Sequence, residues 1–192
     1  PFLKANGAMM TMALLAAGIS AMGLGIVTAW IPEYLQRVHA VPPMQTGAAL
    51  GSLLLLAAFA GQGTYGIIVD WLATRGVRDA TIKIGLVPIA LSIPVAWFAF
   101  QATNSAAFFS WLTVLLICIA PCNAISNTIM QQIAPTELRS RIAAISILII
   151  SLFGFTVGPS LVGALSEYVF GEAQLGMAIQ IVLTGAMAIT LA

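Results

Sequence analysis

Six long apolar stretches constrain the fold of this chain more than any other feature. A membrane core is crossed by about 20 consecutive apolar residues in a helix. Only 7% of the 192 residues are charged, whereas a soluble domain is roughly one-quarter charged. The sequence therefore predicts an all-α, polytopic membrane bundle of six transmembrane helices. The predicted spans cover roughly residues 9–31, 46–69, 82–101, 106–129, 141–169 and 174–192.

The basic residues fall unevenly among the loops between these spans. Loops rich in Lys and Arg stay in the cytoplasm. We therefore expect an integral protein of the inner or plasma membrane with both ends cytoplasmic. The net charge of +1 gives no electrostatic argument for nucleic-acid binding. Of the seven bases, Arg37 lies on one side of the predicted bundle, and the other six lie opposite: Lys4, Arg75, Arg78, Lys83, Arg139 and Arg141.

Polar residues inside the spans are candidates for substrate binding. Asn123 and Asn127 are four residues apart and share one helix face. Thr28, Gln62 and Tyr65 are further polar groups in the first two spans. At membrane depth such groups face protein or a water-filled cavity. The asparagines favour a substrate cavity, whereas hydrogen bonding between helices is the favoured alternative for the other three.

Ionisable residues are absent from the middle of every predicted span. Ion-coupled carriers usually bury an ionisable group, and Glu33, near the outer end of the first span, is the local candidate for coupling. The single histidine, His39, is expected to be solvated in an outer loop. Because no nucleophile–base pair and no set of metal ligands can be assembled, we expect neither catalytic residues, nor a metal, nor a cofactor. An integral membrane lipid-modifying enzyme is accordingly disfavoured.

The stretch from Gly66 to Lys83 concentrates charge in one inner loop. Gly66 would permit a close helix approach. Asp70, at the helix end, could accept hydrogen bonds from a neighbouring helix N-terminus or pair with Arg75 or Arg78. The alternative is a solvated loop whose charges only fix the orientation of the chain.

Glycine and proline in the fifth span predict a bend. Gly154 and Gly158 thin the helix, and Pro159 removes a backbone hydrogen bond. The segment is either a hinge or a static kink.

The inner loop resembles the signature G-x-x-x-D-[RK]-x-G-[RK]-[RK] of the major facilitator superfamily. Two departures are that Trp71 follows the acid where a base is usual, and that Asp70 and Gly76 are further apart. The segments 133–146 and 154–171 resemble that family's cytoplasmic link into helix 11 and its Gly-Pro kink. The likeness covers essentially the whole chain and implies the second half of a twelve-helix fold, with the amino-terminal half missing from this fragment.

Within that superfamily, the end of the first span resembles the spinster-like branch. Its pattern W-x-P-x-[YF]-L-x-R is matched by Trp30, Pro32, Tyr34, Leu35 and Arg37. The branch is linked to export of lysolipids and sphingoid lipids, whereas similar helix ends occur in carriers of organic anions and sugar acids.

The resemblance implies a secondary active transporter that works by alternating access. Its partners would be membrane lipid, the missing amino-terminal half and a small organic or lipid-like substrate, with protons as a candidate coupling ion. The loop with Gly66, Asp70, Arg75 and Arg78 would act as a conformational latch between the halves. A receptor-like or structural bundle is the remaining alternative, and it would need no polar cavity.

Overall fold

A computed structural model describes residues 2–77, 80–133, 138–171 and 174–191. Within these ranges it describes the backbone but not the side chains of residues 2–6, 8–9, 80–83, 123–124, 126–127 and 129–133. All regular structure in these residues is helical. The elements are α1 (Phe2–His39), α2 (Pro43–Ala57), η1 (Ala58–Gln62), α3 (Gly63–Thr74), α4 (Ala80–Phe100), α5 (Ser105–Ile133), α6 (Arg139–Ser151), η3 (Leu152–Val157), α7 (Gly158–Leu165), η4 (Ser166–Phe170) and α8 (Leu175–Leu191).

The all-helical architecture predicted from the sequence is confirmed in the described residues, although the number of membrane-length helices differs from six. Four helices there are long and apolar enough to cross a membrane: Met10–His39, Pro43–Thr74, Ser105–Cys122 and Arg139–Phe170. The third and sixth predicted spans form shorter apolar helices, Ile84–Phe100 and Leu175–Leu191. The structure is thus compatible with a membrane location.

The first helix is longer than expected, and the outer loop after it is correspondingly short. We expected the loop to begin near Ile31, but α1 continues through Pro32 to His39. The connection is confined to residues 40–42, where Ala40 has a φ of 51°. Pro43 then opens α2, a position where its missing N–H costs nothing.

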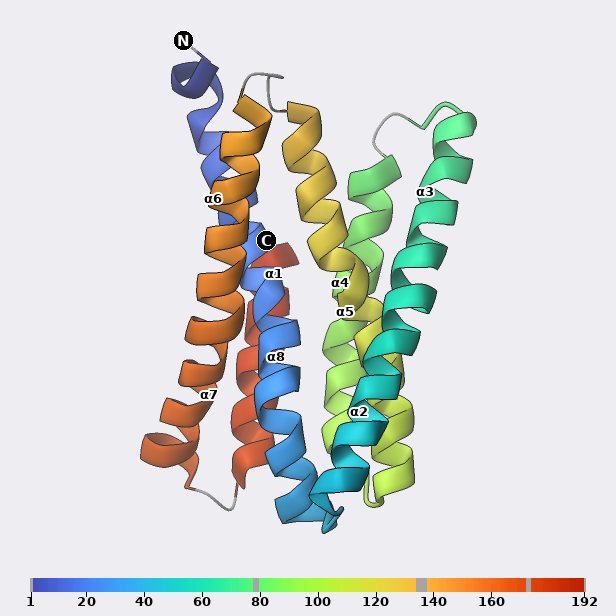
Figure 1. The fold of residues 1–192 in the computed structure, drawn as a ribbon, viewed down its shortest axis with the longest axis vertical. Coiled ribbons are helices and arrows are strands. Elements are labelled where there is room, and N and C mark those ends of the chain that lie inside the picture. Colours follow the sequence, from blue (N-terminus) through green and yellow to red (C-terminus); the bar gives the residue numbers. More distant parts are fainter. Residues whose placement is uncertain (1, 78–79, 134–137, 172–173, 192) are drawn as a thin grey trace.

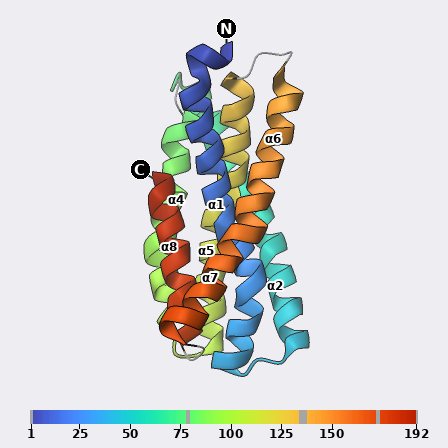
Figure 2. The ribbon, with the colours of Figure 1, turned by 90° about the vertical axis from the view of Figure 1, so that its left-hand side faces the viewer.

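The helices alternate in direction along the bundle (Figure 1). The end of α3 and the start of α6 lie at the same end as the N-terminus, whereas the α1–α2 turn lies at the other. Figure 2 shows the same arrangement from the side. Arg75 and Arg139 therefore lie at one end of the bundle and Arg37 at the opposite end, as the sequence predicted. Which end faces the cytoplasm remains a prediction.

The core lies between α1, α5 and α8, with α4 packed against them. Ile26 and Leu35 of α1, Leu112 of α5 and Ile179 of α8 are fully buried. The two 32-residue segments 43–74 and 139–170 are much less covered. Only 11% and 22% of their most apolar stretches is buried, against 56% for α1. These two segments consequently present most of their apolar side chains outward, including Phe59, which is 75% exposed.

Close backbone contacts tie the exposed segments to the core. A Cβ atom built on Gly25 would overlap the carbonyl oxygen of Gly154, and one built on Gly61 would lie 2.7 Å from the carbonyl oxygen of Ile117. Glycine is therefore required at both crossings. The close approach expected at Gly66 is not found, since a Cβ there meets no described atom within 4 Å.

Three π-helical segments interrupt the exposed spans. η1 lies inside the 43–74 segment, and η3 and η4 lie inside the 139–170 segment. A π turn inserts one extra residue into a helix and often occurs at functional sites. η3 ends two residues before Pro159, which cannot donate a backbone hydrogen bond. The fifth span therefore contains a widened turn just before Pro159, and the bend predicted there stays a prediction.

Candidate functional site

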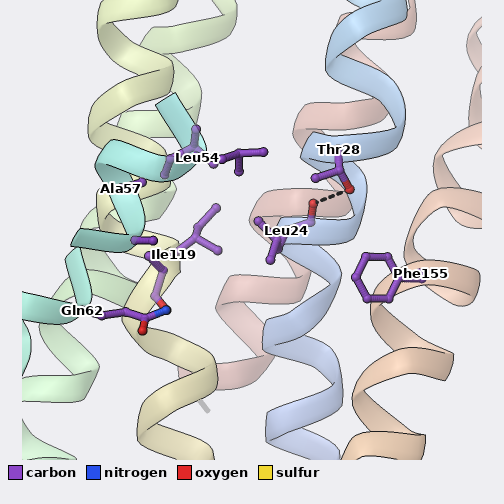
Figure 3. Close-up of a pocket in the computed structure, with 10 residues that line it drawn as sticks. Leu24, Thr28, Leu54, Ala57, Gln62, Ile119 and Phe155 are labelled. Carbon is purple, nitrogen blue, oxygen red and sulfur yellow. Dashed lines mark hydrogen bonds between the residues drawn. The ribbon is translucent and has the colours of Figure 1, made fainter. Parts of the chain in front are cut away.

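A cavity of about 320 Å³ lies between α1, the α2–η1 segment, α5 and η3. In Figure 3, Leu24 of α1 faces Leu54 and Ile119 across this space. Thr28, Gln62 and Phe155 are exposed, so the cavity is open toward the outside of the chain. Its ten lining residues are all apolar except two: Leu24, Thr28, Leu54, Ala57, Ala58, Gln62, Leu116, Ile119, Ala120 and Phe155.

Thr28 and Gln62, two of the predicted substrate-binding residues, share this cavity although they are 34 positions apart. The Thr28 hydroxyl donates to the carbonyl oxygen of Leu24 at 3.0 Å (Figure 3) and of Gly25 at 3.1 Å. Its proton is satisfied by its own helix, which leaves the oxygen as an acceptor toward the cavity.

Gln62 reaches the cavity because η1 packs tightly on α5. The contact of Gly61 with the backbone of Ile117 sets this distance. The side-chain amide of Gln62 donates to the carbonyl oxygen of Ala120 over 3.5 Å. A hydrogen bond of that length is weak, so the amide group can exchange it for a bond to a ligand.

Of the other predicted binding residues, only Tyr65 has a described side chain, and it does not line this cavity. Tyr65 lines a separate, almost wholly apolar groove between α3, α4 and α5, which also includes Pro88 and Cys118. Asn123 and Asn127 belong to α5, but their side chains lie outside the described residues.

The predicted latch lies at the end of α3. Asp70 and Arg75 are both exposed. The guanidinium of Arg75 lies over the indole ring of Trp71, 3.7 Å from its centroid. Such a cation–π contact is typical of Arg on Trp. Trp71, which departs from the family signature, is thus the observed partner of Arg75, while Arg78 lies outside the described residues.

The predicted hinge residues form a crossing with α1. Gly154 lies against Gly25, and a Cβ on Gly158 would lie 3.1 Å from the Cβ of Met22. The indole nitrogen of Trp30 donates to the carbonyl oxygen of Pro159 at 2.9 Å. The glycines therefore serve close packing here, and the hydrogen bond fixes the helix beyond the π segment.

Replacing Trp30 by phenylalanine should destabilise the protein by about 1 kcal/mol, because the Pro159 carbonyl loses a partly buried donor. Thermal unfolding in detergent measures the change. Trp97→Phe is the matched control, since Trp97 is 56% exposed and should change stability by less than about 0.5 kcal/mol. Equal effects of the two substitutions would contradict the role given to the hydrogen bond.

Glu33, the candidate coupling residue near the outer end of α1, pairs with Arg37 at 2.5 Å, and its side chain is 41% exposed. Its role in coupling stays a prediction, whereas His39 differs from what the sequence predicted. His39 is not a solvated loop residue. It is the last residue of α1, packs against the rings of Tyr34 and Phe108, and has a buried Nε2 atom. Its packing stems from the helix extending past Ile31.

Neither protein-family models nor curated protein sequences give a match to this chain. Family membership is accordingly a proposal.

Sequence reasoning missed the apolar wall of the cavity. Leu24, Leu54 and Phe155 are ordinary span residues, and nothing in their local pattern separates them from lipid-facing positions. The one sequence feature that indicated the cavity was the set of glycines at the helix crossings. Gly25, Gly61 and Gly154 mark the crossings that bring the four cavity segments together, but sequence alone does not pair them.

Proposed function

We propose that this chain is one six-helix half of a secondary transporter of the major facilitator type, which moves its substrate by alternating access. The observation that carries the proposal is the cavity with Thr28 and Gln62 in an otherwise apolar wall. Polar groups at membrane depth are retained where they face protein or an aqueous cavity. A second half, packed over the exposed rim, would enclose the substrate between the halves.

The order of the helices supports two inverted three-helix repeats. Each half of the chain has a half-buried helix, then a 32-residue segment interrupted by at least one π segment, then a shorter apolar helix. The first set begins at α1 and the second, running oppositely, at α5 (Figure 1). Inverted repeats of this kind are typical of secondary transporters.

A count of six crossings is compatible with the lengths of the two shorter helices. α4 has 21 residues, or about 31 Å of helix at 1.5 Å per residue. α8 has 17 residues, which is at the lower limit for crossing a membrane of about 30 Å.

The lining favours a small amphiphilic substrate, such as a lysolipid or a sphingoid lipid. Eight of its ten residues are apolar, which suits an alkyl chain, while Thr28 and Gln62 offer hydrogen bonds to a polar group. The second candidate, an organic anion or sugar acid, is recognised best by Arg or Lys. None of the described lining residues is basic, so the lipid-like substrate fits better.

The proposed latch, hinge and coupling roles are based on where their residues lie in the bundle. The exposed end of α3, with Asp70 and Arg75, would contact the other half on the cytoplasmic side and act as the latch. Gly154, Gly158 and Pro159 would let the 139–170 segment change its curvature at η3. Protons are a candidate coupling ion. In that role Glu33 would take up a proton when its ion pair with Arg37 opens.

Cysteine labelling tests the cavity directly. Single cysteines at Gln62 and at Ala90 would be compared after the buried native thiols, Cys118 and Cys122, are replaced by alanine. Ala90 is also exposed but lies on α4, outside the lining. A charged methanethiosulfonate reagent should modify the Gln62→Cys variant at least about tenfold faster, because thiolates form in water and not in hydrocarbon.

The alternating-access proposal predicts that the labelling rate also depends on substrate. Labelling of the Gln62→Cys variant in vesicles should change when NBD-labelled lysophosphatidylcholine is added, because substrate shifts the population between the two states. A rigid receptor-like bundle would give a constant rate. Equal rates at positions 62 and 90 would refute the aqueous cavity and with it the transport proposal.

A further inference from the structure

A second cavity, of about 290 Å³, lies at the other junction of α1 with the 139–170 segment. α1 and α6 run side by side there in both views (Figures 1 and 2). The cavity is separated from the transport cavity by the Gly25–Gly154 crossing. Its lining residues are Gly7, Met10, Thr11, Leu14, Leu138, Arg141, Ile142 and Ile145.

The floor of this groove is apolar and its rim is cationic. Met10 and Ile142 are 7% and 6% exposed and pack with their neighbours into a small core of their own. Thr11 donates its hydroxyl proton to the carbonyl oxygen of Gly7 at 2.8 Å. Arg141 is exposed and brings the permanently charged guanidinium with its five N–H donors to the rim.

The charge of the whole bundle end complements an anionic headgroup. Among the described side chains at the end with the N-terminus, three bases (Arg75, Arg139 and Arg141) outnumber one acid, Asp70. Among those described at the other end, the base Arg37 is outnumbered by two acids, Glu33 and Glu167. Basic residues at a membrane surface attract anionic lipids, so such lipids gather at the first end.

We propose that this groove binds an anionic phospholipid, with one acyl chain along the apolar floor between α1 and α6 and the phosphate on Arg141. The apolar walls gain from burying methylene groups, and Arg is suited to phosphate because its planar donors engage two oxygens. The site rests on the membrane location proposed above and is independent of transport. It would hold α6 against α1 near the end of the bundle with the N-terminus, beyond the Gly25–Gly154 crossing.

The test is a binding measurement on the purified protein in detergent by native mass spectrometry. Dioleoyl-phosphatidylglycerol should bind about fivefold more tightly than dioleoyl-phosphatidylcholine, which is the ratio expected for one basic residue at an anionic surface. Arg141→Gln should reduce the ratio to about one. Arg75→Gln removes the same charge from the same end of the bundle and should leave the ratio unchanged.

Two further measurements test the apolar groove and the need for an acyl chain. Ile145→Trp, at a residue 46% exposed, fills the groove and should weaken both lipids at least about threefold, even where Arg141→Gln fails to fold. Glycerol 1-phosphate in hundredfold excess should not displace the lipid, since it has no acyl chain. Displacement by glycerol 1-phosphate, equal binding of the two lipids, equal effects of the two arginine variants, or unchanged binding to the Ile145→Trp variant would each overturn the proposal.

Discussion

Replacing Gly25 by alanine is expected to lower the melting temperature of the protein by roughly 6–12 °C. A Cβ at this position would overlap the carbonyl oxygen of Gly154. A backbone atom cannot rotate away as a flexible side chain can, so α1 and η3 must separate. Overpacking of this kind costs typically 1–3 kcal/mol and sometimes more, and we expect the upper part of that range.

The matched control is Gly51→Ala in the 43–74 segment. A Cβ at Gly51 meets no described atom within 4 Å, and alanine favours helix over glycine by up to about 1 kcal/mol. The melting temperature of this variant should be unchanged or slightly raised. Thermal unfolding in one detergent, followed by tryptophan fluorescence, compares the two. A Gly25→Ala variant that melts like the original protein would show that the crossing is loose.

Gly25 and Gly51 show how much of the helix packing could be predicted from the sequence. Apolar runs of membrane length predict helices because only a helix satisfies the backbone hydrogen bonds of a single segment in lipid, and the observed helices follow those runs. Small residues predict close packing, yet Gly25 is locked against another backbone while Gly51 and Gly66 face open space. The partner of a glycine depends on the tertiary arrangement, which the pattern of one helix does not contain.

The W-x-P-x-Y-L-x-R stretch shows that a short motif can reflect the fold rather than the substrate. Its residues carry the resemblance, but three of the matched side chains also make structural contacts within this chain. Trp30 bonds to Pro159, Tyr34 packs edge-on against Phe100, and Arg37 pairs with Glu33. A motif that fixes a helix end can recur in carriers of different substrates, so it favours a fold more than it specifies a substrate.

For Thr28 and Gln62 the sequence favoured hydrogen bonding between helices over a cavity, whereas the structure places both in one cavity lining. Polar residues inside apolar spans are few, and two of them, Thr28 and Gln62, do line one cavity. Tyr65, only three residues after Gln62, lies in another groove. The Gly61–Ile117 contact places α5 between the cavity and this groove. The π segment η1, which ends at Gln62, alters the helical rotation between Ala58 and Tyr65. Sequence periodicity assumes a regular helix and cannot anticipate that shift.

Replacing Ala58 by tryptophan is expected to reduce transport at least about tenfold while leaving the melting temperature within about 2 °C of the original. Ala58 lines the cavity but is itself exposed, so the indole would occupy the open space without disturbing the core. A substrate that needs this space would be excluded in every state of the cycle. Uptake of NBD-labelled lysophosphatidylcholine into proteoliposomes that hold both halves of the transporter measures the loss.

Ala90→Trp supplies the control, because Ala90 is exposed on α4 and outside the cavity lining. It adds the same side chain to the same membrane and should transport at the original rate. If both variants transport equally well, the substrate does not pass between α1, η1 and α5. If both lose transport and also melt early, the loss reflects folding, and the smaller Ala58→Leu substitution decides whether occupied volume alone closes the path.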